Sequence, residues 1–180
     1  MTAKIPEWAR RAQAAWRWRG GERPAFAVVP QANEESVWDY PRPPLVDSDL
    51  RHVVVRLGDL VVADTRNALR VLETASPPTF YLPARDVRCE LLIAAPGASR
   101  CEWKGEARYW SLRGEPVAWS YPAPLPDFEA LRDHFGFYPQ RLACTVDGEP
   151  VTPQPGGFYA GWITKEIVGP WKGEPGSEGW

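Results

Sequence analysis

The chain has 180 residues and a formal net charge of −2, and it contains 20 Pro, 15 Gly and 10 Trp. Pro and Gly exceed average usage but stay below the level of disordered low-complexity chains, and the 44% of hydrophobic residues is typical of globular proteins. The near-neutral charge disfavours a nucleic-acid binder, which needs many Lys and Arg to neutralise phosphates. We therefore expect a folded protein with no nucleic acid among its partners.

Apolar runs and cysteines indicate the compartment. No apolar run approaches the roughly 18–20 residues of a membrane span, and Arg interrupts the N-terminus where a signal peptide is apolar. The widely spaced Cys89, Cys101 and Cys144 favour unpaired, buried or half-buried thiols in a reducing compartment. Zinc sites usually show close ligand pairs, which these cysteines do not form. Together, these features predict a cytoplasmic protein that contacts no membrane and holds no metal or cofactor.

The N-terminal part combines a predicted amphipathic helix with a Pro-rich connector. Residues 4–19 place Trp8 and Trp16 on one helical face, and Gly20-Gly21 ends the helix. We expect the Trp face to pack on the protein, the alternative being a surface for a membrane or an acidic partner. The connector, residues 22–50, contains a predicted strand at 26–29.

The central part begins with a hairpin. Apolar runs at 52–57 and 60–64 flank Gly58-Asp59, as a type II′ turn requires. The pattern then predicts a short helix at 67–73, a strand at 79–82 and a helical turn near residue 86.

The later elements are also mainly strands. We expect one or two strands over 100–112, another over 117–121, and a helix from Asp127 through Phe135. Asp147-Gly148 favours a type I′ hairpin between 141–146 and 150–151. In the Gly-, Pro- and Trp-rich tail, residues 171–174 repeat the Trp-Lys-Gly-Glu of 103–106. The pattern predicts a mainly β (α+β), antiparallel fold with an N-terminal helix and connector (1–36), a β core (37–147) and a packed C-terminal extension (148–180).

Several segments in this order resemble the family called domain of unknown function 427. The most specific are the Lys-Gly-Glu-Ala stretch and the Trp-Ser-Tyr-Pro stretch after it. The matching segments are residues 62–65 with 68–73, 77–83 with 86–88, 101–110, 118–122 and 137–139. The resemblance covers about residues 37–142, and the Gly-rich tail is similar to an extension of some relatives.

The resemblance implies a small tent-like fold in which two sheets meet at an angle around a groove. Tent-shaped proteins usually hold a zinc ion on paired C-x-x-C motifs, which this chain lacks, and some of them bind small cyclic molecules in aromatic cages. The family is also filed under a nucleotidyltransferase heading. Such enzymes need a D-x-D pair after a Gly turn, whereas Asp47-Ser48-Asp49 lies in the connector and favours a solvated acidic turn.

Residues 103–110 carry the candidate chemistry. As one strand, they place Lys104, Glu106 and Arg108 on one face, either as a solvated set of cross-strand pairs or as a groove face that binds an anion. Gly105 within such a pattern indicates a bulge or a close approach by a ligand or another backbone. The nearby rings of Trp103, Tyr109, Trp119, Tyr121 and Tyr138 either fill a core or line a pocket.

Other polar residues give weaker evidence of a functional role. Arg70 and Glu73, three apart on the predicted helix, either pair at the surface or direct Arg70 to the groove. His52 and His134 are expected to be structural, and the sequence contains no known catalytic motif.

The leading hypothesis is a protein that binds a small polar or cyclic ligand in an aromatic groove. Its predicted ligand-binding residues are Arg70, Tyr81, Trp103, Lys104, Glu106, Tyr109, Trp119 and Tyr121. Two alternatives stay open. One is an enzyme acting on nucleotides or esters, and the other is an interaction module that uses the Arg/Trp helix or the Trp-rich tail.

Overall fold

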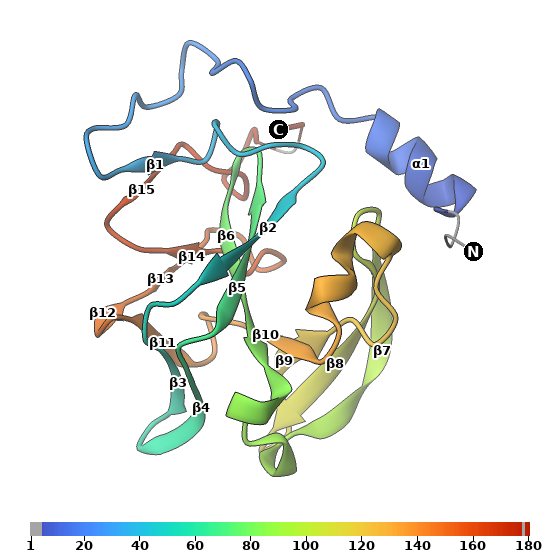
Figure 1. Ribbon diagram of the computed structural model, residues 1–180, viewed down its shortest axis with the longest axis vertical. Coiled ribbons are helices and arrows are strands. Elements are labelled where there is room, and N and C mark those ends of the chain that lie inside the picture. The colour runs from blue at the N-terminus through green and yellow to red at the C-terminus, as the bar shows by residue number, and fades with distance from the viewer. Residues whose placement is uncertain (1–4, 178) are drawn as a thin grey trace.

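The computed structural model describes residues 5–177 and 179–180 and confirms a mainly β fold (Figure 1). The larger sheet is antiparallel and has seven strands. In spatial order they are β2 (Leu45–Asp49), β5 (Ala68–Glu73), β6 (Ser76–Pro83), β10 (His134–Phe137), β9 (Glu115–Ser120), β8 (Gly105–Leu112) and β7 (Ile93–Cys101).

A second antiparallel sheet packs against the first. Its four strands are, in order, β12 (Glu149–Pro150), β11 (Ala143–Val146), β3 (Val53–Leu57) and β4 (Leu60–Thr65). Both predicted hairpins are confirmed here: Leu57 pairs with Leu60 around Gly58-Asp59, and Val146 pairs with Glu149 around Asp147-Gly148.

The remaining elements are short. Two strand pairs join distant segments: β1 (Glu35–Ser36) runs parallel to β15 (Ile167–Val168), and β13 (Thr152–Pro153) is antiparallel to β14 (Trp162–Ile163). The helices are α1 (Glu7–Ala14) and the 3₁₀ helices η1 (Ala84–Asp86), η2 (Cys89–Leu91) and η3 (Pro126–Leu131). Within the part of the chain that the structure describes, no helix has the length and apolar character to cross a membrane.

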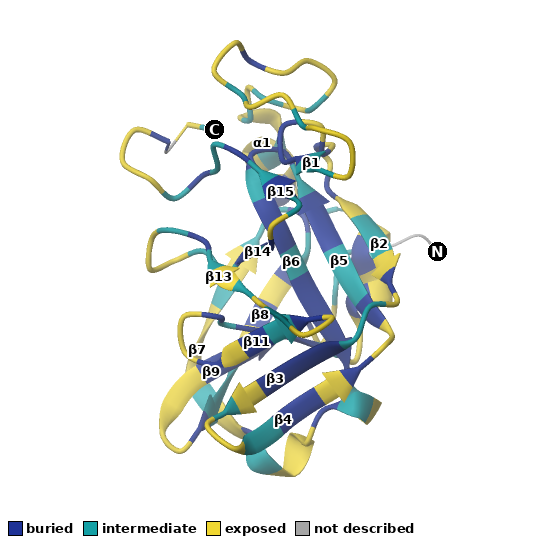
Figure 2. Ribbon diagram, turned by 90° about the vertical axis from the view of Figure 1, so that its left-hand side faces the viewer, coloured by how far each residue is buried: buried dark blue, intermediate teal, exposed yellow. Residues whose placement is uncertain are grey.

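The main core lies between the two sheets. Figure 2 shows the partly buried strands β3, β4 and β11 running obliquely to β5 and β6. The core combines Val53 and Val55 of β3 with Phe80 and Leu82 of β6, and the fully buried Trp162 stacks on Phe80 at 4.8 Å between ring centroids. Because side chains alternate along a strand, the intervening residues of β6 point to the other face of the seven-stranded sheet.

The segment that follows α1 and the C-terminal tail lie together beside this sheet (Figure 1). Trp38 is fully buried, and its indole N–H donates a hydrogen bond of 2.7 Å to the carbonyl of Pro170 in the tail. The rings of Trp18 and Trp180 pack on Trp38, with centroids at 5.6 and 5.3 Å. The aromatic residues of both ends thus form a small core of their own.

The predicted helix at 67–73 is wrong, because this segment is strand β5. Its residues favour a helix in isolation, but β5 lies between β2 and β6 and pairs with both. A strand places Arg70 and Glu73 on opposite faces, so they do not pair with each other. Arg70 instead forms ion pairs with Asp49 (3.3 Å), Glu35 (3.1 Å) and Asp47 (3.4 Å).

The acidic pair Asp47 and Asp49 lies in β2, so the predicted solvated turn is also wrong. Asp49 is only 6% exposed and accepts hydrogen bonds from Arg51, the shortest 2.6 Å long. These bonds hold the pKa of Asp49 below its ordinary value, although burial acts in the opposite direction. The D-x-D sequence therefore serves an ion-pair network.

Three further predicted elements differ in extent. Lys4 lies outside the described residues, and the first helix ends at Ala14, before Trp16 and Trp18 turn to different partners. Residues 26–29 form no strand, since Pro24 and Pro30 flank them and Phe26 stacks on Trp180. The helix predicted from Asp127 through Phe135 is the 3₁₀ helix η3, and Phe135 already belongs to β10.

Candidate functional site

A cavity of about 400 Å³ opens on the face of the seven-stranded sheet opposite the main core. Its floor comes from alternate residues of three strands: Thr79 and Tyr81 of β6, Ala107 and Tyr109 of β8, and Trp119 of β9. Residues between them, such as Phe80 and Leu82, belong to the main core. The alternation of strands thus separates a packed face from a hollow one.

Aromatic rings in mutual contact form one side of the cavity. The indole N–H of Trp119 donates a hydrogen bond of 3.2 Å to the hydroxyl oxygen of Tyr81, and the two rings meet edge to face at 5.9 Å. Tyr138 packs on Trp119 with centroids at 4.8 Å. Desolvation raises the pKa of Tyr81, of Tyr121 and of Tyr138, the last to about 12, so these phenols stay protonated at neutral pH.

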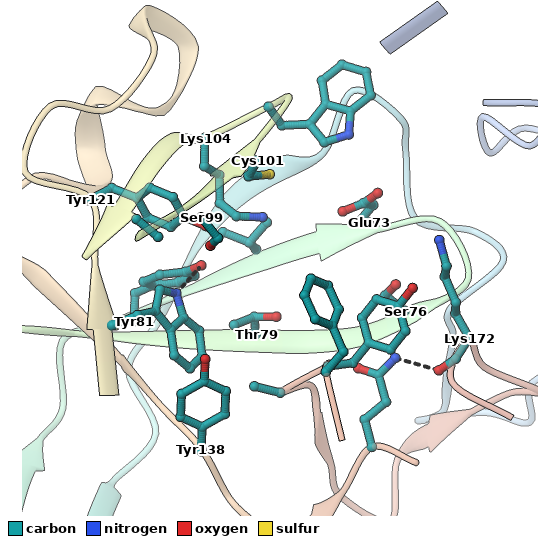
Figure 3. Close-up of a pocket in the computed structure, with 18 of the residues that line it drawn as sticks. Glu73, Ser76, Thr79, Tyr81, Ser99, Cys101, Lys104, Tyr121, Tyr138 and Lys172 are labelled. Atoms are coloured by element: carbon teal, nitrogen blue, oxygen red, sulfur yellow. Dashed lines mark hydrogen bonds between the residues drawn. The ribbon is translucent and has the colours of Figure 1, made fainter. Parts of the chain in front are cut away.

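Lys104 reaches the cavity from the turn between β7 and β8 (Figure 3). Gly105 permits this turn with a φ of +102°, and its Cα faces the backbone of residues 123–125. The close approach at Gly105 is therefore to another backbone segment. Because Lys104 lies in the turn, it leaves the strand alternation and does not share a face with Glu106 and Arg108, contrary to the one-strand prediction.

The Lys104 ammonium is charged and unpaired. Burial acts to lower its pKa, whereas interactions with Cys101, Tyr81, Tyr121 and Glu73 act to raise it, and the pKa lies well above its ordinary value. No hydrogen bond or ion pair joins Lys104 Nζ to any side chain among residues 5–177 and 179–180. The neighbouring Trp103 also lines the cavity, and its Nε1 is buried without a hydrogen-bond partner among the described residues.

The second Trp-Lys-Gly-Glu tetrapeptide brings another lysine to the same cavity. Gly173 has a φ of +117°, similar to that of Gly105, and Lys172 lines the wall opposite Lys104 (Figure 3). The Lys172 ammonium lies 3.9 Å from the ring centroid of Trp16, and the guanidinium of Arg42 lies 4.1 Å from the same ring. Trp16 is thus held by two cation–π contacts.

The acidic residues of the cavity already have partners. Glu73 forms an ion pair of 3.2 Å with Arg42, and Glu102 accepts a hydrogen bond of 2.6 Å from Trp16 Nε1. Burial lowers the pKa of Lys172, and Arg42 lowers it too, while Glu73 and Glu102 act in the opposite direction. The charged residues that line the cavity are Glu73, Glu102, Arg100, Lys104, Arg141 and Lys172, four basic and two acidic.

Most of the predicted ligand-binding residues come together here. Those that line the cavity are Tyr81, Trp103, Lys104, Tyr109, Trp119 and Tyr121. Arg70 is occupied by its three carboxylates in the network of β2 and β5. Glu106 is exposed and lies 3.6 Å from Arg100 on the outer side of the β7–β8 hairpin. Neither residue lines the cavity.

Several lining residues were not predicted as ligand-binding. They come from the chain ends and from β5 and β6: Trp16, Glu73, Thr79, Tyr159 and Lys172. The repeated Trp-Lys-Gly-Glu sequence was the one available signal for Lys172.

The other reactive side chains lie apart from one another. Cys101 lines the cavity, Cys144 is buried as expected, and Cys89 is exposed, which contradicts the prediction for that thiol. His52 pairs with Asp64 at 2.7 Å near the surface. Among the residues that the structure describes, no three His, Cys, Asp or Glu side chains are grouped closely enough to hold a metal ion.

Comparison with known families gives one match. A family model described as "Domain of unknown function (DUF427)" matches residues 44–148, which include the strands of the cavity floor and the first Trp-Lys-Gly-Glu sequence. No curated protein matches the chain.

Proposed function

Given that the chain belongs to the DUF427 family, whose description states no activity, we propose from the site itself that the protein binds a small aromatic molecule in the cavity. The observation that carries this proposal is a hollow of about 400 Å³, walled by aromatic rings, at which hydrogen-bond donors remain unused. Ligand pockets commonly have volumes of roughly 300–1,000 Å³ and combine apolar walls with a few polar groups.

The rings are positioned before any ligand arrives. Trp119 is fixed by Tyr81 and Tyr138, and Trp16 by Glu102, Arg42 and Lys172. A preorganised wall lowers the entropic cost of binding. A flat ligand therefore gains ring contacts without first ordering the side chains that make them.

The two alternative functions have weaker support. A general base works best with a pKa near the working pH, whereas the pKa of Lys104 is displaced upward, which disfavours this lysine as a base at neutral pH. A docking module would expose the aromatic residues of its ends. Trp16, Trp18 and Trp180 instead pack against other parts of the chain, whereas Trp8, Phe26 and Phe158 are exposed.

A cavity-filling variant tests the proposal. Thr79 lies on the floor, and its side chain forms no hydrogen bond to a described residue. Thr79→Trp should therefore fill the hollow and keep the strand. Thr145 of β11 is a matched control, since it lies in a strand of the other sheet. A library of small aromatic compounds, acids and uncharged molecules alike, is screened by ligand-observed NMR and by thermal shift.

We expect binders that raise the unfolding temperature of the natural protein and of Thr145→Trp, and that lose at least tenfold in affinity for Thr79→Trp. A screen without any binder, or binders whose affinity is unchanged by Thr79→Trp, would reject the proposal. The thermal unfolding of each variant without ligand shows whether it has folded.

A further inference from the structure

The residues that line the cavity leave several hydrogen-bond donors without an acceptor in the described chain. Lys104 offers three N–H donors and Trp103 one, and none of these is used within the described chain. Tyr81 accepts a hydrogen bond from Trp119 and interacts with Tyr121, which leaves its own proton as a further donor. These donors are available to an acceptor group of a ligand that displaces water from the cavity.

The protein's own carboxylates do not supply these acceptors. Glu73 is engaged by Arg42 at 3.2 Å and Glu102 by Trp16 at 2.6 Å, both on the side of the cavity formed by the chain ends. Figure 3 shows Lys104 beside Tyr81 and Tyr121, while Glu73 and Lys172 lie toward the other end. The Lys104 end is thus a cationic, donor-rich corner next to aromatic rings.

The arginines that line the cavity have partners of their own. Arg100 lies 3.6 Å from Glu106 on the outer side of the β7–β8 hairpin, and the guanidinium of Arg141 donates a hydrogen bond to the carbonyl of Pro116. Lys104 forms no ion pair within the described chain, and an anionic ligand would offset the cost of burying its ammonium.

We propose that the cavity selects a planar aromatic carboxylate, whose carboxylate accepts hydrogen bonds from Lys104 Nζ while the ring lies among Tyr81, Trp119 and Tyr121. This inference rests on the proposed function and specifies the ligand class of the same site. A single ammonium matches a singly charged carboxylate. A phosphate dianion is typically held by several backbone amides or a forked guanidinium.

The test compares two ligands of nearly equal shape, 2-naphthoate and 2-naphthamide, by isothermal titration calorimetry at neutral pH. We expect the natural protein to prefer the acid by about tenfold or more, because charge-assisted hydrogen bonds are the stronger ones. Lys104→Gln should remove this preference and leave the affinity for the amide almost unchanged. Lys165→Gln is the matched control, since the Lys165 side chain is 85% exposed and lies away from the cavity.

The outcomes separate this inference from the proposed function. Equal binding of acid and amide, or binding of uncharged library members but not of 2-naphthoate, overturns the inference and leaves the binding function standing. Tighter binding of 2-naphthyl phosphate than of 2-naphthoate likewise overturns the carboxylate assignment. If no aromatic compound binds at all, the proposed function itself fails. Should Lys104→Gln not fold, the acid–amide ratio of the natural protein remains decisive.

Discussion

Substituting Gly136 of β10 by Ala tests whether the aromatic wall of the cavity is as closely packed as the structure indicates. This glycine is the cross-strand partner of both Trp119 and Tyr81. A Cβ at this position would lie 2.3 Å from Cζ2 of Trp119 and 2.5 Å from Cε2. The indole therefore occupies the space in which any other residue would place its side chain.

The expected cost of Gly136→Ala follows from this clash. Because non-bonded carbons settle at about 3.5–4.0 Å, the indole must move by about 1 Å, and the nearest free space is the cavity. Overpacking of this kind costs about 1–3 kcal/mol, and weakening the Trp119–Tyr81 hydrogen bond adds about 1 kcal/mol. The lower chain entropy of unfolded Ala returns about 0.4–1 kcal/mol. The net loss is about 2 kcal/mol, or about 4–8 °C in unfolding temperature for a chain of this size.

Urea unfolding followed by fluorescence measures this loss, and near-ultraviolet circular dichroism reports the moved indole. Gly157→Ala is the control, since a Cβ there meets nothing within 4 Å, and its stability should be unchanged or slightly higher. Trp119→Leu removes the clashing atoms, so Gly136→Ala should cost much less in that background. A full loss in both backgrounds, or no loss in the natural one, would refute the packing argument.

Three other expectations concern the ion-pair network and the thiols. Arg70→Met should lower the free energy of unfolding, measured by urea titration, by about 2–3 kcal/mol, because Glu35 and Asp47 lose their partner but remain partly exposed. The control Arg85→Met, at a 69% exposed site, should leave the free energy of unfolding almost unchanged. Since the pKa of Asp49 is depressed in the folded protein, its contribution to stability is present above the unfolded pKa of about 3.9 and is lost as the pH falls below it. Unfolding midpoints between pH 6 and pH 3 should show that slope, and Asp49→Asn should flatten it; an equal slope in both proteins would assign the loss to other groups. In the folded protein, mass spectrometry should find Cys89 alkylated by iodoacetamide and Cys144 unreacted until urea is added. Because the thiolate is the reacting form and the pKa of Cys89 is raised, its labelling should be slow at neutral pH and faster at higher pH. Early labelling of Cys144 would contradict its burial.

The sequence predicted those features that are decided locally. Gly58-Asp59 and Asp147-Gly148 supply turn conformations that few other residues adopt at low cost, so both hairpins follow from four residues. The aromatic lining also followed, because Trp103, Tyr109, Trp119 and Tyr121 lie close together in the chain. Their arrangement around a hollow depends on strand alternation, which the sequence displays directly.

Features decided by distant contacts could not be predicted in this way. The segment Ala68–Glu73 has good helix formers, yet pairing with β2 and β6 determines its conformation. The one-strand interpretation of residues 103–110 places Lys104 on the face of Glu106. Gly105 is compatible with the chain reversal at residues 102–104, but strand alternation alone does not reveal it. Trp16 and Lys172 are separated from the strands of the floor by dozens of residues, so their approach to the cavity becomes visible only in the folded chain.

The two kinds of cavity residue differ in where they lie in the chain. Lys104 and the rings of the floor belong to residues 44–148, the part shared with the family, whereas Trp16, Tyr159 and Lys172 lie outside it. The floor of the cavity and Lys104 thus come from the matched part of the chain, and the opposite wall comes from its two ends. If the proposed acid binding holds, a relative that has Lys104 but different ends should accept acids of another size.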